Sequence, residues 1–193
     1  MNKLIYVLAV VFVLTSCSQE APKNYATLSG KIMNQNSDSL IVRSRTYSKK
    51  INVNPDGSFL DTLKIATGNY NLFDGSESTS IYLKNGFDIN ITIDTKQFDE
   101  TVKYTGTGAE ASNYLAQKAL LQEQVFNDFT IYELDKAAFD KKMNSVFTNM
   151  KSLLETTNNL DSTFISLQSK QIDGLNKYIV SNYEDKQYME KVL

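Results

Sequence analysis

Three acidic residues, Asp94, Asp99 and Glu100, lie at the end of the most regular strand pattern in the chain. Two carboxylates held across a sugar can hydrolyse a glycosidic bond by acid–base chemistry. In an extended chain, however, the adjacent Asp99 and Glu100 would point to opposite faces. The sequence therefore favours a solvated loop at this place over a catalytic pair.

A second group of polar residues, Asn52, Asn54 and Asp56 before Gly57, partly matches the start of a calcium-binding loop. A full loop needs an acidic residue twelve positions from the first ligand, and that position is occupied by Leu63. Pro55 fixes its own φ and Gly57 accepts a positive φ, which is the chemistry of a tight turn. We therefore predict a hairpin turn and no metal site.

The third candidate is Gly106-Thr107-Gly108, which precedes a helical pattern. A glycine-rich turn before a helix can bind phosphate. The segment lacks the further Gly and the Lys of phosphate-binding loops. It is better explained as a domain junction, with Thr107 near the helix start and Glu110 favourable in the first helical turn.

Missing residue types exclude several classes of chemistry. The chain has no His and a single Cys, Cys17. A Ser-His-Asp triad and most zinc sites are thereby excluded, as are an internal disulfide and a C-x-x-C redox pair. No cofactor is predicted, and an enzyme would have to rely on carboxylates alone.

Charge argues against nucleic acid as a partner. The formal net charge is −2, and Lys and Arg form no dense cluster along the sequence. Arg43, Arg45, Lys49 and Lys50 are spread over a predicted strand pair and are interpreted as a solvated face. A protein of this charge lacks the electrostatic signature of nucleic-acid binding.

Aromatic side chains offer a weaker indication of a binding surface. Most Tyr and Phe residues fall on predicted inward faces. Four are less clearly buried and could line a partner surface: Tyr47, Tyr82, Tyr178 and Tyr188.

Hydrophobic residues alternate with a period of two from residue 25 to residue 105. The clearest case is the segment 87–95, where Phe87, Ile89, Ile91 and Ile93 alternate with polar residues. Asn54–Gly57 and Asn85-Gly86 are tight-turn signals, and the second predicts a hairpin. Seven or eight short strands at this spacing predict an antiparallel β-sandwich or barrel with one buried face per sheet.

After residue 106 the period changes to 3.6, which predicts three amphipathic helices. We expect Asp135 to cap the second helix, and Asp161 or Ser162 to cap the third. The expected buried stripes are Tyr114, Leu115, Ala119, Leu121, Val125, Phe126 and Phe129 in the first helix, Phe139, Met143, Val146, Phe147, Met150, Leu153 and Leu154 in the second, and Ile165, Ile172, Leu175, Ile179 and Tyr183 in the third. The predicted fold class is α+β, a sandwich followed by a three-helix segment.

The first sixteen residues have the pattern of a secretory signal. Lys3 precedes an apolar run from Leu4 to Leu14, which is too short for a confident membrane span. Leu14-Thr15-Ser16-Cys17 then resembles a bacterial lipobox, in which the Cys is acylated and becomes the new N-terminus. The resemblance implies a lipid on Cys17, with residues 17–24 as a polar tether.

Two further groups of residues resemble the region that precedes the thioredoxin domain in lipid-anchored disulfide reductases of the TlpA/ResA type. One comprises Asn54–Phe59, Gly68–Tyr70 and Ile81–Gly86, and the other runs from Phe98 to Leu115. The resemblance implies a sandwich of the carboxypeptidase-regulatory, transthyretin-like group. The W-C-x-x-C site of that family has no counterpart in this chain, so no catalytic residue is carried over.

Together these patterns predict a signal peptide at 1–16, the tether at 17–24, a β-sandwich domain at 25–105 and an α-helical domain at 106–193. We expect a non-catalytic, lipid-anchored accessory protein facing the periplasm, whose partners are the membrane and a thioredoxin-fold domain or envelope protein. The alternative is a stand-alone binding module for a glycan, peptide or protein. Ser18 after the Cys favours the outer membrane slightly over the inner one.

Overall fold

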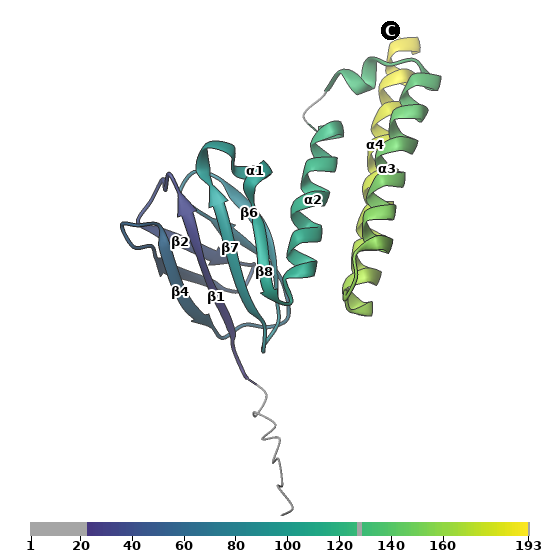
Figure 1. Cartoon of the computed structure of the whole chain (residues 1–193). Coiled ribbons are helices and arrows are strands. Elements are labelled where there is room, and N and C mark those ends of the chain that lie inside the picture. Colours follow the sequence, from purple (N-terminus) through teal and green to yellow (C-terminus); the bar gives the residue numbers. More distant parts are fainter. Residues whose placement is uncertain (1–22, 127–128, 193) are drawn as a thin grey trace, which may run out of the picture.

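The computed structural model describes residues 23–126 and 129–192, which form a β-sandwich followed by helices (Figure 1). The predicted α+β fold class is confirmed. The signal segment, Cys17 and most of the predicted tether lie outside the described residues. Within the described residues, no helix is long and apolar enough to cross a membrane.

In the described part of the chain, eight strands form two four-stranded sheets. The first sheet has the order β4-β1-β7-β8, comprising Ser58–Leu63, Ala26–Met33, Asp88–Asp94 and Lys103–Thr107. The second has the order β3-β2-β5-β6, comprising Ser48–Asn52, Ser39–Arg43, Gly68–Phe73 and Ser78–Leu83. The strands β8 and β6 are therefore edge strands of different sheets.

Strand pairing differs from the sequence prediction in one sheet. β1 and β7 run parallel, with Thr27 beside Asp88 and Met33 beside Asp94, although all other pairs are antiparallel. The turns at Asn54–Gly57 and Asn85-Gly86 join strands of different sheets, so neither closes a hairpin. Turn chemistry fixes a local chain reversal, whereas the hydrogen-bonding partner is chosen by packing over the whole sandwich.

Alternating apolar residues form the sandwich core. Ile89, Ile91 and Ile93 of β7 are buried, while Asn90 and Thr92 between them are exposed. Gly30 lets β1 lie close to β7, because a Cβ there would meet the Ile91 carbonyl oxygen at 2.1 Å. Burial of these side chains is the main stabilising term for the sheets.

The helical part contains α2, α3 and α4, which comprise Ala109–Phe126, Lys136–Thr156 and Ser162–Val192. The described chain also has a short α1 (Phe98–Thr101) between β7 and β8, and two 3₁₀ turns, η1 (Thr95–Gln97) and η2 (Phe129–Glu133). Asp135 accepts a hydrogen bond from the Ala138 N–H as the predicted cap of α3. α4 continues without a break through Gly174.

A second hydrophobic core lies among these helices and includes Phe139, Met150, Ile172 and Ile179. Two predicted stripes need correction. In α2, Ala119 and Phe126 are exposed, whereas Lys118 is buried. In α4, Ile165 is 40% exposed, and the buried face begins at Phe164 and includes Gln168. In both helices the buried face includes a polar residue, Lys118 or Gln168. A prediction that places only apolar residues on the buried face therefore puts these two residues on the exposed face.

Candidate functional site at the junction of sandwich and helices

One turn of α2 covers the open side of the sandwich, where β6 and β8 present unpaired edges (Figure 1). Ser112 contacts the first of these edges. Its Oγ accepts a hydrogen bond from the Tyr82 N–H at 3.0 Å and donates one to the Tyr82 carbonyl oxygen at 3.4 Å. The side chain thus takes the place of a neighbouring strand for β6.

The next residue, Asn113, does the same for the other sheet. Its Oδ1 accepts from the Tyr104 N–H at 2.9 Å, and its Nδ2 donates to the Tyr104 carbonyl oxygen at 2.7 Å. Edge strands with unpaired backbone groups invite association with other chains. The adjacent Ser112 and Asn113 therefore protect an edge of each sheet and fix α2 to both.

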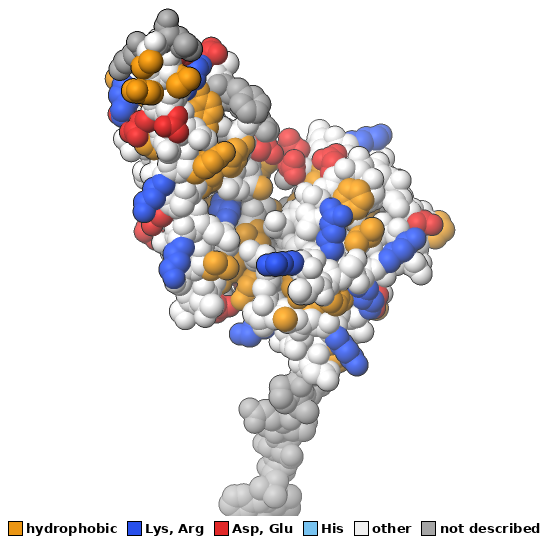
Figure 2. Space-filling view, turned by 180° about the vertical axis from the view of Figure 1, so that it is seen from behind, with side chains coloured by type: hydrophobic (Ala, Val, Ile, Leu, Met, Phe, Trp, Pro, Cys, Tyr) orange, Lys and Arg blue, Asp and Glu red, His pale blue; other side chains and the backbone are white. Residues whose placement is uncertain are grey.

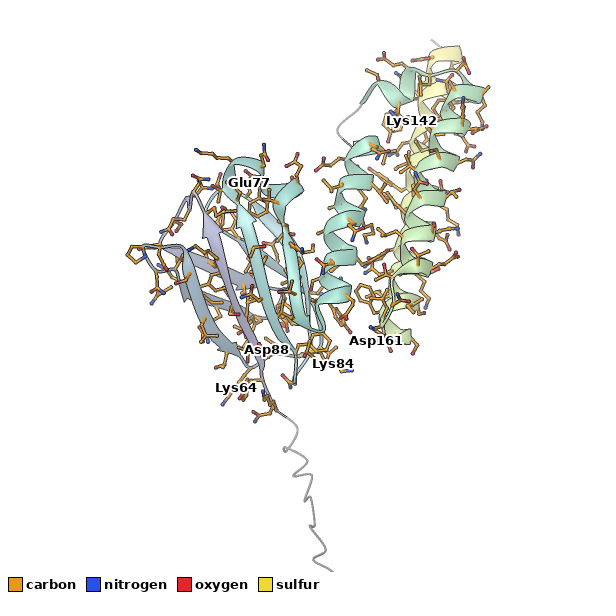
Figure 3. All side chains as sticks on the ribbon, in the orientation of Figure 1. Lys64, Glu77, Lys84, Asp88, Lys142 and Asp161 are labelled. Carbon is orange, nitrogen blue, oxygen red and sulfur yellow. The ribbon has the colours of Figure 1, made fainter. Side chains whose placement is uncertain are left out.

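An aromatic cluster extends this junction to α4. The Tyr82 ring lies edge-on to Phe164 with the ring centroids 4.8 Å apart, and Phe164 is edge-on to Tyr114 at 5.6 Å. The Tyr82 hydroxyl donates to Asp161 Oδ2 at 3.1 Å, and Asp161 Oδ1 accepts from the Phe164 N–H. Asp161, near the start of α4 in Figure 3, thus caps that helix and binds the sandwich to it. Figure 2 shows hydrophobic side chains gathered where the two parts meet.

A buried polar group lies one turn further along α2 and α4. Lys118 is 8% exposed, and its Nζ donates to Gln168 Oε1 at 2.5 Å and to Gln171 Oε1 at 3.4 Å. The ammonium also lies 5.8 Å from the centroid of the Tyr114 ring. Within the described chain, the Tyr114 hydroxyl and Gln168 Nε2 are buried without a hydrogen-bond partner.

Burial changes the protonation equilibria at this junction. Desolvation lowers the pKa of Lys118 to about 8, because the charged amine is removed from water among neutral groups. Desolvation, with the Asp161 hydrogen bond as a smaller cause, raises the pKa of Tyr82 to about 12. An amine of lowered pKa can act as a base or nucleophile, but this one is too enclosed to meet a large substrate. The geometry is that of a fixed joint between two cores.

The structure places the three predicted acidic residues on two elements, β7 and α1, which are joined by hydrogen bonds between Asp94 and Thr101. Asp94 ends β7, where its Oδ1 accepts from the Lys96 N–H and from Asn34 Nδ2, and these hydrogen bonds lower its pKa. Asp99 and Glu100 belong to α1 and line one wall of a surface groove whose other wall is α2. The α2 residues of this groove are Asn113, Ala116, Gln117 and Leu120, so no second carboxylate lies across it.

The turn predicted at Asn54–Gly57 and the glycine segment 106–108 are each held by specific contacts. Asp56 Oδ1 accepts from the Ser58 N–H and hydroxyl, and Gly57 has a φ of 83°. Gly106 and Gly108 also have positive φ, and a Cβ on Gly108 would meet the Phe87 ring at 2.3 Å. No cluster of three or more potential metal-ligating side chains occurs in the part of the chain that the structure describes.

The four tyrosines predicted to line a partner surface differ in burial. Tyr178 and Tyr188 are 60% and 66% exposed, whereas Tyr47 packs edge-on against Tyr70. Tyr82 is buried in the junction and is not available to a partner. Cys17, the predicted lipidation site, lies outside the described residues.

The main junction residues were not identified from the sequence. Ser112 and Asn113 follow the Gly-Thr-Gly segment and have no distinctive spacing, and Lys118 interrupts an otherwise apolar helical face. That interruption was the one available signal, since a lysine within an apolar stripe is seldom buried without a reason.

Comparisons with known proteins add little to this geometry. No family model and no curated protein matches the chain. A DUF3823 family protein from Bacteroides ovatus is similar over 35% of this chain and 43% of its own, with 18% identity and a TM-score of 0.27. Another, from Parabacteroides merdae, is similar over 44% and 47%, with 17% identity and the same TM-score. The chain thus matches less than half the length of each, and such scores carry no argument about fold or function.

Proposed function

We propose that this protein is a lipid-anchored, non-catalytic module that faces the periplasm and positions a partner relative to the membrane. The observation that carries the proposal is the joint made by α2. Because Ser112 and Asn113 bind an edge of each sheet, and Asp161 binds Tyr82, the helices have a fixed direction relative to the sandwich. A fixed direction is what a spacer between a membrane and a partner requires.

The shape supports the same role. The chain enters β1 at one end of the sandwich, and the last described residues of α4 lie far from that point (Figure 1). A helix of 31 residues extends about 45 Å, and α3 packs beside it over much of that length. In the finer form of the proposal, which rests on the resemblance of Asn54–Phe59 and Phe98–Leu115, the partner is a thioredoxin-fold domain.

The alternative, a stand-alone binding module, is supported by a separate feature of α4. Tyr183, Gln187 and Tyr188 line an open groove with Asp135 and Lys136 at the start of α3. Tyr188 and the neighbouring Met189 are more than half exposed. A peptide or protein partner could bury these side chains there.

The intact mass of the native protein from a membrane fraction distinguishes the two forms. A mass equal to residues 17–193 plus acyl groups would support the stand-alone module. A larger mass, with tryptic peptides beyond Leu193, would support an accessory region joined to a further domain. An unacylated mass would overturn the lipid anchor in both forms.

Cys17→Ser removes the thiol that the proposal acylates. We expect the variant to move from the membrane pellet to the soluble fraction, because a lipidated residue is then absent. Ser18→Ala keeps the thiol and should remain in the pellet. Retention of Cys17→Ser in membranes washed with high salt would contradict the proposed anchor.

A further inference from the structure

Charged side chains of the sandwich are divided between its two ends. We define the tether end as the end that holds the start of β1 and the loops 44–47, 64–67 and 84–87, and the far end as the opposite one. The exposed basic residues of the tether end are Lys23, Arg45, Lys64 and Lys84, and its exposed acidic residue is Asp88. The acidic residues of the far end are Asp38, Asp56, Asp74, Glu77, Asp94, Asp99 and Glu100, and they outnumber its exposed lysines, Lys31, Lys96 and Lys103. Figure 3 shows Lys64, Lys84 and Asp88 near the chain entry and Glu77 at the other end.

Strand topology brings these basic residues together. β2 and β3 are joined at the tether end, β4 leads to β5 there, and β6 leads to β7 there. The Gly86 N–H donates to the Tyr25 carbonyl oxygen, which fixes the loop of Lys84 beside the start of β1. The Tyr70 hydroxyl donates to the Ala66 carbonyl oxygen and holds the loop that follows Lys64. These hydrogen bonds fix the backbone of the loops that carry Lys64 and Lys84.

Two lysines of the sandwich are paired with acidic residues, whereas the basic residues of the tether end are not. Lys49 binds Asp61 at 2.7 Å, and Lys50 lies 3.8 Å from Asp38. Among the described residues, Lys23, Arg45, Lys64 and Lys84 make no ion pair. Arg43, although near the tether end, turns away to Asn71 and the ring of Phe73. Glu110, in the first turn of α2 after β8, adds a second acidic side chain beside Asp88. Four basic against two acidic side chains still leave net positive charge at this end of a protein whose overall charge is −2.

We propose that the tether end of the sandwich is an electrostatic contact surface for anionic lipid headgroups. The choice of a membrane rests on the proposed lipid anchor at Cys17. Tyr25 lies eight positions after Cys17, so the start of β1 can stand at most about 28 Å from the anchored residue. Basic residues within about a Debye length of an anionic bilayer, roughly 8 Å, are attracted to it.

The acidic far end gives this contact a direction. An anionic surface attracts the tether end and repels the far end, so the sandwich stands with β1 rising from the membrane. The turn between α3 and α4 also reaches towards the tether side, but its charged side chains are acidic: Glu155 is exposed, and Asp161 is bound by Tyr82 and the Phe164 N–H. Contact with the bilayer is therefore made by the sandwich loops, and the end of α4 lies on the side away from the bilayer (Figure 1).

Binding of the unlipidated protein to vesicles tests the surface separately from the anchor. A form beginning at Ser18 retains every described element. Sedimentation with phosphatidylcholine vesicles, with and without phosphatidylglycerol, should show binding only when the anionic lipid is present. Each basic residue near such a surface contributes roughly fivefold to the binding constant, so Lys64→Glu with Lys84→Glu should weaken binding at least about 25-fold.

A matched control makes the same charge change at the far end. Lys96→Glu with Lys103→Glu replaces two exposed lysines there and should leave vesicle binding nearly unchanged. Equal loss in both double variants, or equal binding to neutral vesicles, would overturn the proposal. Displacement by inorganic phosphate at constant ionic strength would also overturn it, because it would indicate a discrete phosphate site. If the native protein is unacylated but still binds anionic vesicles, the lipid anchor on Cys17 is rejected, whereas the proposed headgroup contact at the tether end is retained.

Discussion

Lys118 is a charged side chain that the fold buries among neutral partners. Its ammonium donates to two glutamines of α4 and faces the Tyr114 ring, and no ion pair reaches it from the described residues. Removing an ammonium from water is costly unless it is paired. The lowered pKa of Lys118 is the measurable sign of that cost.

The unfolding free energy should therefore depend on pH through this residue. An unfolded lysine has a pKa near 10.5, and that of folded Lys118 is about 8. Between these values the unfolded state binds more protons, so stability rises with pH, and the destabilisation of about 3 kcal/mol is complete below pH 8. Denaturant unfolding between pH 8 and about pH 10 should show this rise, and Lys118→Met should flatten it. Lys177→Met, at an exposed position of α4, should keep the slope of the unaltered protein.

At the scale of elements, α2 decides how the two cores are joined. It packs on β6 and β8 with one face and on α3 with another. Its first turns carry the polar contacts to both sheets, and its hydrophobic residues Tyr114 and Leu115 belong to the helical core. The sandwich and the helical segment consequently share one element that neither can lose without exposing backbone groups or apolar surface.

Asn113→Ala tests this shared element. The substitution removes both hydrogen bonds to the backbone of Tyr104 and leaves a partly buried N–H and carbonyl without partners. We expect a loss of about 1–3 kcal/mol in unfolding free energy, with faster hydrogen exchange at β8. Asn52→Ala, at an exposed position of β3, should change stability by less than about 0.5 kcal/mol. Equal effects of the two substitutions would contradict the role of Asn113.

The whole molecule depends on tyrosines that remain protonated. Burial raises the pKa of Tyr82 and of Tyr114 to about 12, and raises that of Tyr104 further. The Tyr104 hydroxyl crosses from the first sheet to the Ser80 carbonyl oxygen of the second. Three protonated tyrosines are thus buried at the contacts between the two sheets and between the sandwich and the helices.

Alkaline pH should destabilise the protein cooperatively. The unfolded tyrosines lose protons near pH 10 while the folded ones keep theirs, so the unfolding free energy falls as pH rises above 10. Tyrosinate absorbance measured together with unfolding midpoints, from about pH 9 to about pH 11, should show deprotonation of these residues only on unfolding. Tyr104→Phe should reduce the alkaline decline, whereas Tyr178→Phe, at a position 60% exposed, should not. Ionisation of all tyrosines before unfolding would contradict this prediction.

Local chemistry in the sequence determined the elements of this protein. The alternation around Ile89 and Ile91 predicts a strand, and the spacing from Phe139 to Met150 predicts a helix, because each pattern depends only on residues close along the chain. Pro55 and Gly57 determine a turn for the same reason. Cys17 and the apolar run before it predict an anchor without reference to any fold.

Only the tertiary structure decided which distant residues meet. It placed β1 parallel to β7, gave the edges of β6 and β8 to Ser112 and Asn113, and turned Lys118 inward to Gln168. It also brought Lys64 and Lys84 to one end of a sandwich whose sequence shows no basic cluster. Most of these contacts join residues thirty or more positions apart, and even Asn113 and Tyr104, nine positions apart, belong to a helix and a strand that a local pattern does not bring together. The choice of partners depends on the total burial of both cores.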